Sequence, residues 1–148
     1  MRALALALLT CAFTVAAENP YVGTWRMDKA KSTPDPDLPA LDSLTVEFVQ
    51  EGRTLKAIPI VNGAASATVL IDGREHTMGG KRPDPLGATH YVSTATGKTN
   101  LTVFKRDGRT VATRKNSISR DGKTMTSQTT GTLSNGKKLN VSILLDRQ

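Results

Sequence analysis

The sequence predicts an all-β protein, a single up-and-down antiparallel β-barrel of about 8–10 strands. Three turn signals, Asp107-Gly108, Asp121-Gly122 and Asn135-Gly136, follow one another at intervals of 14 residues. These dipeptides suit two-residue hairpin turns, whose central residues need positive φ. The spacing leaves about ten residues per strand and no room for crossover helices. A sequential meander removes its two sheet edges most simply by closing into a barrel, and a two-sheet sandwich is the alternative.

Residues 1–17 have the layout of a secretory signal peptide. Arg2 gives a positive start, an apolar run follows to Val15, and small residues precede the expected cleavage before Glu18. The run is too short to cross about 30 Å of hydrocarbon as a membrane anchor. Cys11, the only cysteine, does not follow a small residue, so lipoprotein anchoring is disfavoured. We therefore expect export to the periplasm or the medium, with residues 18–148 as one barrel domain and no transmembrane segment.

The charge balance is basic, with 20 Lys+Arg against 13 Asp+Glu. Loss of Arg2 with the signal peptide lowers the formal charge from +7 to +6. Such a charge suits anionic partners, although a solvated surface is the more common meaning of it. Aromatic residues make up only 4% of the chain, which argues against stacking on single-stranded nucleic acid. We expect a monomer with no cofactor and no specific nucleic-acid binding.

The first half of the domain is expected to form short strands between turns. Leu44, Val46 and Phe48 alternate with polar residues, which is typical of a half-buried strand. Pro59 indicates an edge position or a bulge, because proline cannot donate to a ladder. The proline-rich segment 29–42 is expected to be a long surface loop, or a lid with one helical turn at its end. The expected strands are 21–28, 43–50, 54–61, 66–71 and 74–78.

The second half is more regular after a Gly- and Pro-rich segment at 79–87. The expected strands are 88–95, 100–105, 110–119, 124–133 and 139–147. Strands 110–119 and 124–133 are poor in large apolar residues, so part of the lumen should be polar. Such a lumen holds water or a hydrogen-bonding ligand. Alternatively, this side of the barrel flattens toward solvent.

Barrel closure is indicated by the two ends of the domain. Side chains alternate along a strand, so Trp25 shares a face with Tyr21 and Gly23, and Arg147 falls on the apolar face of the last strand. A lone charge there would be costly unless an indole lay beside it. We therefore expect a cation–π contact between Trp25 and Arg147 across the closure.

The combination of Gly-x-Trp on the first strand with a basic residue near the end of the last strand resembles the calycin proteins, the lipocalins and fatty-acid-binding proteins. These proteins carry Gly-x-Trp on the first strand and a basic residue that packs over that Trp. The matching residues are Gly23-Thr24-Trp25 and Arg147. The runs 19–27, Lys31-Ser32 and 121–126 are similar to a family of small exported bacterial lipocalin-like proteins. The resemblance implies a lipocalin-like barrel and brings no established activity.

Catalytic motifs are absent from the sequence, which favours a protein that is not an enzyme. It contains no Gly-x-Ser-x-Gly, phosphate loop or His-Glu-x-x-His. Asp72, Glu75, His76 and His90 could form a carboxylate–imidazole site. A solvated or hydrogen-bonded role is the favoured interpretation of these four residues.

The preferred function is binding of a small amphipathic or polar molecule in the barrel. Loops 29–42 and 79–87 are long enough to gate its mouth, and Arg114 or Lys115 could receive an anionic group. Strand alternation does not allow every candidate to face inward without a bulge. The candidate ligand-binding residues are His90, Tyr91, Arg114, Asn116 and Gln128.

The alternative is a surface-interaction protein that binds anionic cell-envelope polymers. Consecutive turns of a meander alternate between the two barrel ends, so basic residues of alternate turns should cluster. We call this set the basic cluster: Lys105, Arg106, Arg109, Lys137 and Lys138.

Overall fold

The computed structural model describes residues 18–79 and 84–148, so the expected signal peptide lies outside the described residues. Within them, the chain forms eleven strands of one antiparallel sheet and a single 3-10 turn. The predicted all-β class is confirmed. The strands are β1 (Gly23–Met27), β2 (Leu44–Glu51), β3 (Thr54–Val61), β4 (Ala64–Ala65), β5 (Val69–Ile71), β6 (Glu75–Thr77), β7 (His90–Thr96), β8 (Thr99–Arg106), β9 (Arg109–Ile118), β10 (Thr124–Thr132) and β11 (Lys138–Arg147).

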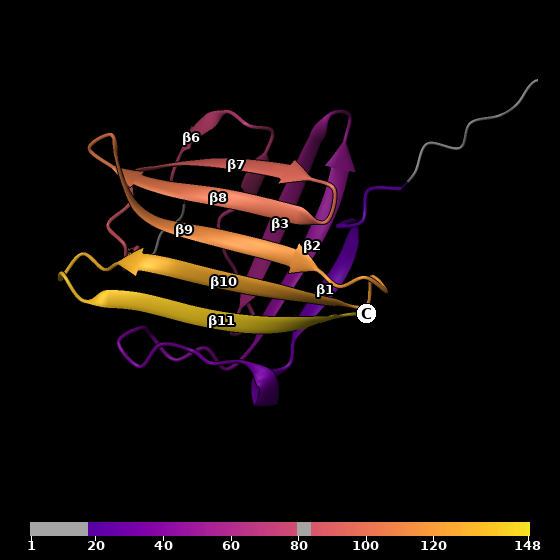
Figure 1. The fold of residues 1–148 in the computed structure, drawn as a ribbon, viewed down its shortest axis with the longest axis horizontal. Helices are drawn as coiled ribbons and strands as arrows, with labels where there is room; N and C mark the ends of the chain where they lie inside the picture. Colours follow the sequence, from indigo (N-terminus) through magenta and orange to yellow (C-terminus); the bar gives the residue numbers. More distant parts are fainter. Residues whose placement is uncertain (1–17, 80–83) are drawn as a thin grey trace, which may run out of the picture.

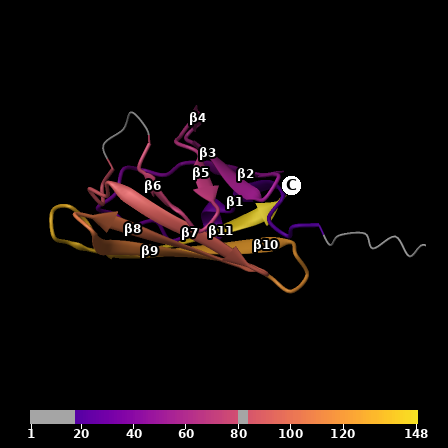
Figure 2. The same cartoon turned by 90° about the horizontal axis from the view of Figure 1, so that it is seen from above.

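The sheet order is β4-β3-β2-β1-β11-β10-β9-β8-β7-β6, with β5 also paired to β3. Along this order, all neighbouring strands are consecutive in the sequence except β1 and β11, which join the first strand to the last. Figures 1 and 2 show the sheet curling so that β7 to β11 form one layer and β2, β3 and β5 cross behind it. The β1–β11 pair is the closure that the sequence predicts.

A seam lies on the opposite side of the barrel, between β5 and β7. Two hydrogen bonds cross it: Gly73 N donates to Ser93 O at 2.9 Å, and Leu70 N donates to the Tyr91 hydroxyl at 2.9 Å. The Asp72-Gly73 turn carries the chain across this seam, from β5 toward β6. The barrel is therefore held by a short ladder of three residue pairs at β1–β11 and by isolated bonds at the seam.

The outer neighbour of β3 is broken in two, which corrects the single strand expected at 66–71. β4 pairs with Ile60 and Val61, whereas β5 pairs with residues 55–57. Pro59 stands between these two stretches, where its missing N–H breaks no ladder. The proline therefore sets the position of the interruption.

The helical turn η1 (Lys29–Lys31) lies at the start of segment 29–42 and not at its end as expected. Asp28 caps it, because its Oδ1 accepts hydrogen bonds from Ala30 N at 3.1 Å and Lys31 N at 3.3 Å. This is the usual way in which an aspartate satisfies the first free N–H groups of a helical turn.

Residues 32–43, which we call the strap, follow this turn. The strap runs beside β11, where Thr33 pairs with Ser142, and Asn140 N donates to Asp35 Oδ2 at 3.3 Å. In Figure 1 it is the indigo to purple segment beneath β11. Its end is held by Asn62, whose Oδ1 accepts from the backbone N–H groups of Asp42 and Ser43. The strap thus continues the sheet edge where β1 ends and then returns to β2.

The core occupies the interior of the barrel. Alternate residues of β11 point inward, and Leu139, Val141, Ile143 and Leu145 are all buried. Trp25 is fully buried, and its Nε1 donates to Tyr21 O at 2.8 Å. This arrangement leaves one part of the interior unfilled.

Candidate functional site

A cavity of about 330 Å³ lies inside the barrel, bounded by the strap and by strands from both layers. At about 30 Å³ per water molecule, it has room for about ten waters. Its volume is within the range of small-molecule sites, at the lower end. The lumen is therefore larger than a space for a few waters.

One wall of the cavity is apolar. It is formed by residues of β2, β3 and β5, by β11, and by two leucines of the strap. The principal side chains are Leu38, Leu41, Leu44, Val46, Phe48, Val69, Ile71, Val141 and Ile143.

The opposite wall is polar and comes from β8, β9 and β10. Its side chains are Asn100, Thr102, Arg114, Asn116, Ser127 and Thr129. They alternate with outward-facing residues along the three strands, so each strand contributes two. A polar lumen at β9 and β10 is what the sequence predicts, and the alternative of a side flattened toward solvent is not observed.

Arg114 places a positive charge in this wall. Its Nε donates to Thr129 Oγ1 at 3.1 Å, and its guanidinium carbon lies 5.3 Å from the centre of the Phe104 ring. It forms no ion pair within the described residues. Burial lowers the pKa of Arg114, with the charge of Asp84 opposing the shift, but an arginine stays protonated in proteins. Within residues 18–79 and 84–148, neither terminal Nη group of Arg114 has a hydrogen-bond partner.

Asp84 also borders the cavity, but its carboxylate is occupied by its own turn. Oδ1 accepts from Leu86 N at 3.3 Å, and Oδ2 accepts from Ala88 N at 2.8 Å. Asp84 therefore moderates the field at Arg114 from a distance and does not bind it directly.

A buried hydrogen-bond network extends from Asn116 toward β7. Asn116 Nδ2 donates to Asn100 Oδ1 at 2.9 Å, and Asn100 Nδ2 donates to Ser93 Oγ and Thr94 O, each at 2.9 Å. Ser93 Oγ also lies 2.8 Å from Thr102 Oγ1. Asn100, Thr102 and Ser93 were not among the sequence candidates. The role of Asn100 depends on the strand register, since Asn100 lies directly opposite Asn116 across β8 and β9.

The structure brings Arg114 and Asn116 together in the cavity but not the other three candidates. Gln128 is a correction: it is exposed on the outer face of β10, because its neighbours Ser127 and Thr129 face inward. Tyr91 is buried, but its hydroxyl is used at the seam by Leu70 N.

His90 does not border the cavity either. Its Nδ1 lies 3.0 Å from Thr89 Oγ1, in an exposed contact. It precedes Tyr91 on β7 and therefore points to the other face of the strand. No bulge brings both residues inward.

Trp25 and Arg147 face each other in the β1–β11 register. The guanidinium carbon of Arg147 lies 4.4 Å from the centre of the Trp25 ring. Arg147 is exposed and not buried, so it covers the end of the barrel from outside. It also donates to three backbone carbonyls, those of Pro20, Val22 and Gly122.

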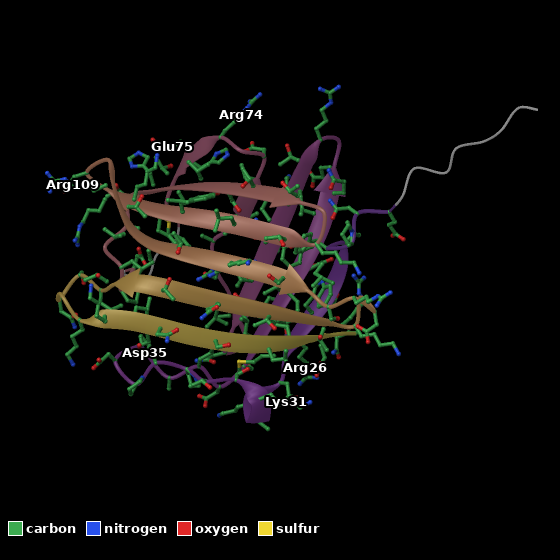
Figure 3. All side chains as sticks on the ribbon, in the orientation of Figure 1. Arg26, Lys31, Asp35, Arg74, Glu75 and Arg109 are labelled. Atoms are coloured by element: carbon green, nitrogen blue, oxygen red, sulfur yellow. The ribbon has the colours of Figure 1, made fainter. Side chains whose placement is uncertain are left out.

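The basic cluster lies at the β8–β9 and β10–β11 turns, at the left end in Figure 1. Figure 3 shows Arg109 projecting outward there. Two of its lysines are ion-paired: Lys105 Nζ lies 2.6 Å from Glu75 Oε2, and Lys137 Nζ lies 2.5 Å from Asp37 Oδ1. The hydrogen bond that Lys137 donates to the Asp37 carboxylate raises the pKa of Lys137. The cluster is thus interspersed with carboxylates.

The carboxylate–imidazole candidates form separate local pairs. His76 Nε2 lies 2.9 Å from Asp72 Oδ1, and this hydrogen bond lowers the pKa of Asp72. Glu75 is paired with Lys105 and not with either histidine. Across residues 18–79 and 84–148, no group of three or more His, Cys, Asp or Glu side chains could hold a metal ion. The same ranges contain no helix that could cross a bilayer.

Comparison with known proteins identifies the fold and nothing finer. No protein-family model and no curated protein sequence matches the chain. Solved structures do match. The zebrafish ileal bile acid-binding protein complexed with cholic acid has a TM-score of 0.59 and 15% identity, covering 87% of this chain and 99% of that one. The chain has a calycin-type fold.

Two further structures support the same conclusion. A mutant of the fluorescent protein UnaG has a TM-score of 0.61 and 17% identity, over 87% of this chain and 96% of that one. A fatty acid binding protein of Schistosoma mansoni, in complex with arachidonic acid, has a TM-score of 0.58 and 12% identity, over 90% and 99%. The calycin resemblance predicted from Gly23-Thr24-Trp25 and Arg147 is confirmed at the level of the fold.

Proposed function

We propose that this protein binds a small amphipathic anion, such as a carboxylic acid, inside the barrel without chemical conversion. The observation that carries the proposal is Arg114, a half-buried arginine that borders the cavity and whose guanidinium has only Nε hydrogen-bonded within the described residues. A charge removed from water is costly unless it is paired. A carboxylate matches the planar fork of a guanidinium and would supply that partner.

The apolar wall supplies the other half of the proposed site. A hydrocarbon chain lying along β2, β3 and β5 would contact Val46, Phe48 and Ile71, while its acid group reached Arg114 on the facing layer. Burial of apolar ligand surface stabilises the complex by about 25 cal/mol per Å² before ordering costs are subtracted. Two of the similar solved structures contain cholic acid and arachidonic acid, which are amphipathic acids.

A titration of the purified domain with dodecanoate tests this proposal. Arg114→Met keeps most of the side-chain volume and removes the charge, so dodecanoate affinity should fall by about tenfold to a hundredfold. Lys115→Met is the matched control, because Lys115 is exposed on the outer face of the same strand. Equal dodecanoate affinity in the wild-type chain and Arg114→Met would contradict the proposal.

Native mass spectrometry of protein purified from its own host provides the second measurement. A retained mass that is absent from Arg114→Met would identify the natural ligand directly. We expect that mass to belong to an organic acid.

We further propose that the domain acts outside the cytoplasm, in the periplasm or the medium. The support is the signal-peptide layout of residues 1–17 and the absence of cysteine after Glu18. The chain would then belong with the small exported bacterial lipocalin-like proteins that it resembles. Cell fractionation followed by N-terminal sequencing should recover a chain beginning near Glu18, and an uncleaved chain in the cytoplasm would contradict this assignment.

A further inference from the structure

We infer that the ligand carries a hydrogen-bond donor, such as a hydroxyl group, which binds Asn116 Oδ1 in addition to the acid group at Arg114. This inference rests on the proposed function and specifies its ligand class: a hydroxylated amphipathic acid. The observations that support it are the fixed orientation of Asn116, an acceptor without a partner, and the division of the cavity into two unlike walls.

The orientation of Asn116 is determined by a chain of contacts that begins at a backbone carbonyl. Thr94 O can only accept a hydrogen bond, so the Asn100 side-chain atom 2.9 Å away must be the amide nitrogen. Asn100 therefore presents its oxygen to Asn116, at 2.9 Å. Asn116 must then direct its own amide nitrogen toward Asn100. Its Oδ1 cannot be exchanged with Nδ2 without placing two oxygens in contact.

Asn116 Oδ1 is consequently an acceptor without a donor. It is buried and has no hydrogen-bond partner in the described structure. The residue is 8% exposed and borders the cavity. Burying a polar atom without a partner costs free energy, so most such atoms in native proteins have one. The Tyr21 hydroxyl does not supply it, because this hydroxyl donates to the backbone carbonyl of Asn116 instead.

Arg114 and Asn116 are two residues apart on β9, and both side chains border the cavity. Their Cα atoms are therefore about 7 Å apart along the strand. Arg114 offers donors to an acid group, whereas Asn116 offers an acceptor to a hydroxyl group. A single molecule that carries both groups on one side would engage both residues.

The two walls of the cavity also favour a ligand that is polar on one side and apolar on the other. β8, β9 and β10 contribute polar side chains, and β2, β3 and β5 contribute mainly apolar ones. An unsubstituted hydrocarbon chain would offer no hydrogen-bond donor to Asn116 Oδ1. A chain with a hydroxyl on one side would pair this atom and still lay its apolar side against Val46 and Phe48.

The test compares dodecanoate with monohydroxylated dodecanoates whose hydroxyl is placed at successive positions along the chain. For the wild-type domain, we expect at least one hydroxylated acid to bind about tenfold more tightly than dodecanoate. In Asn116→Leu this preference should disappear or reverse. Gln128→Leu is the matched control, because it makes the same change on the outer face of β10.

Arg114→Met separates this inference from the proposed function. It should weaken all the acids by a similar factor and leave the preference for the hydroxylated acid in place. If dodecanoate binds through Arg114 but every hydroxylated acid binds no better, the inference is wrong and the proposed function stands. If no acid binds, both are wrong. The wild-type series decides the matter even if Asn116→Leu does not fold.

Discussion

Trp25 and Arg147 show how two residues can stabilise a barrel end. Trp25 is fully buried beneath the guanidinium, and Arg147 also donates to three backbone carbonyls from two segments of the chain. Trp25→Ala should lower the free energy of unfolding by about 3–5 kcal/mol. Arg147→Ala should lower it by about 1–3 kcal/mol, because the stacking and a set of charge-assisted hydrogen bonds are lost.

A double-mutant cycle on this pair measures the contact itself. We expect a coupling free energy of at least about 0.5 kcal/mol in urea unfolding. Strictly additive effects would show that the stacking contributes nothing beyond the separate contacts of each residue.

Tyr21 makes the stability depend on pH in the alkaline range. Burial raises the pKa of Tyr21. The folded protein therefore keeps a proton that the unfolded chain loses above about pH 10. The free energy of unfolding should fall as pH rises above that value, by at most about 1.4 kcal/mol per pH unit from this group. Chemical unfolding of wild type and Tyr21→Phe between neutral and alkaline pH should show a shallower decline in the variant.

The sequence predicted Arg114 and Asn116 as cavity residues because β9 has an unusual run of polar residues. It could not select between inward and outward residues on β10 without the register. Gln128 was therefore grouped with Asn116, although Ser127 and Thr129 are the β10 residues that face the lumen. The sequence does not predict Asn100 as a cavity residue, because its role depends on lying opposite Asn116. Pairing between strands cannot be read from a single segment.

At the scale of single strands, Gly131 allows β9 and β10 to approach closely. A Cβ at this position would lie 2.4 Å from Val111 O and 2.5 Å from the Ala112 Cβ. Gly131→Ala should lower the free energy of unfolding by about 1–3 kcal/mol through overpacking.

Thr130→Ala provides the control for this substitution, because Thr130 is the exposed neighbour on the same strand. Its effect should stay within about 0.5 kcal/mol. A Gly131→Ala domain as stable as wild type would mean that the two strands separate easily at this point.

Long strands were predicted within one or two residues, because period-two alternation and Asp-Gly or Asn-Gly turns agree in β8 to β11. The short elements were not. β4 and β5 depend on where β3 offers free backbone groups, and this is set by Pro59 on another strand. The strap was recognised as a prolonged irregular segment, but its course beside β11 depends on the Thr33–Ser142 pairing. Local sequence contains no signal for such a partner.

At the scale of the whole molecule, the alternative function of binding anionic polymers through the basic cluster gives a further prediction. Binding to an anionic polymer such as dextran sulfate should be weak, because Lys105 and Lys137 already have carboxylate partners. Affinity should fall steeply as salt rises through about 0.15 M, where the screening length is about 8 Å.

Co-sedimentation at low and high salt measures this binding. Replacing the five residues of the basic cluster with glutamine should abolish it. Binding that persists in this variant, or whose affinity does not change with salt concentration, would assign the interaction to another surface.

The β1–β11 closure also has a consequence for folding kinetics. It pairs positions 25 and 147, so this contact spans nearly the whole domain and we expect it to form late. Contacts of such high sequence separation slow folding into the range of milliseconds to seconds. Trp25 is the only tryptophan, and it lies at this closure. Its fluorescence emission therefore reports on formation of the closure. In stopped-flow refolding, the change in Trp25 emission should follow, and not precede, the growth of the β-sheet signal in far-UV circular dichroism.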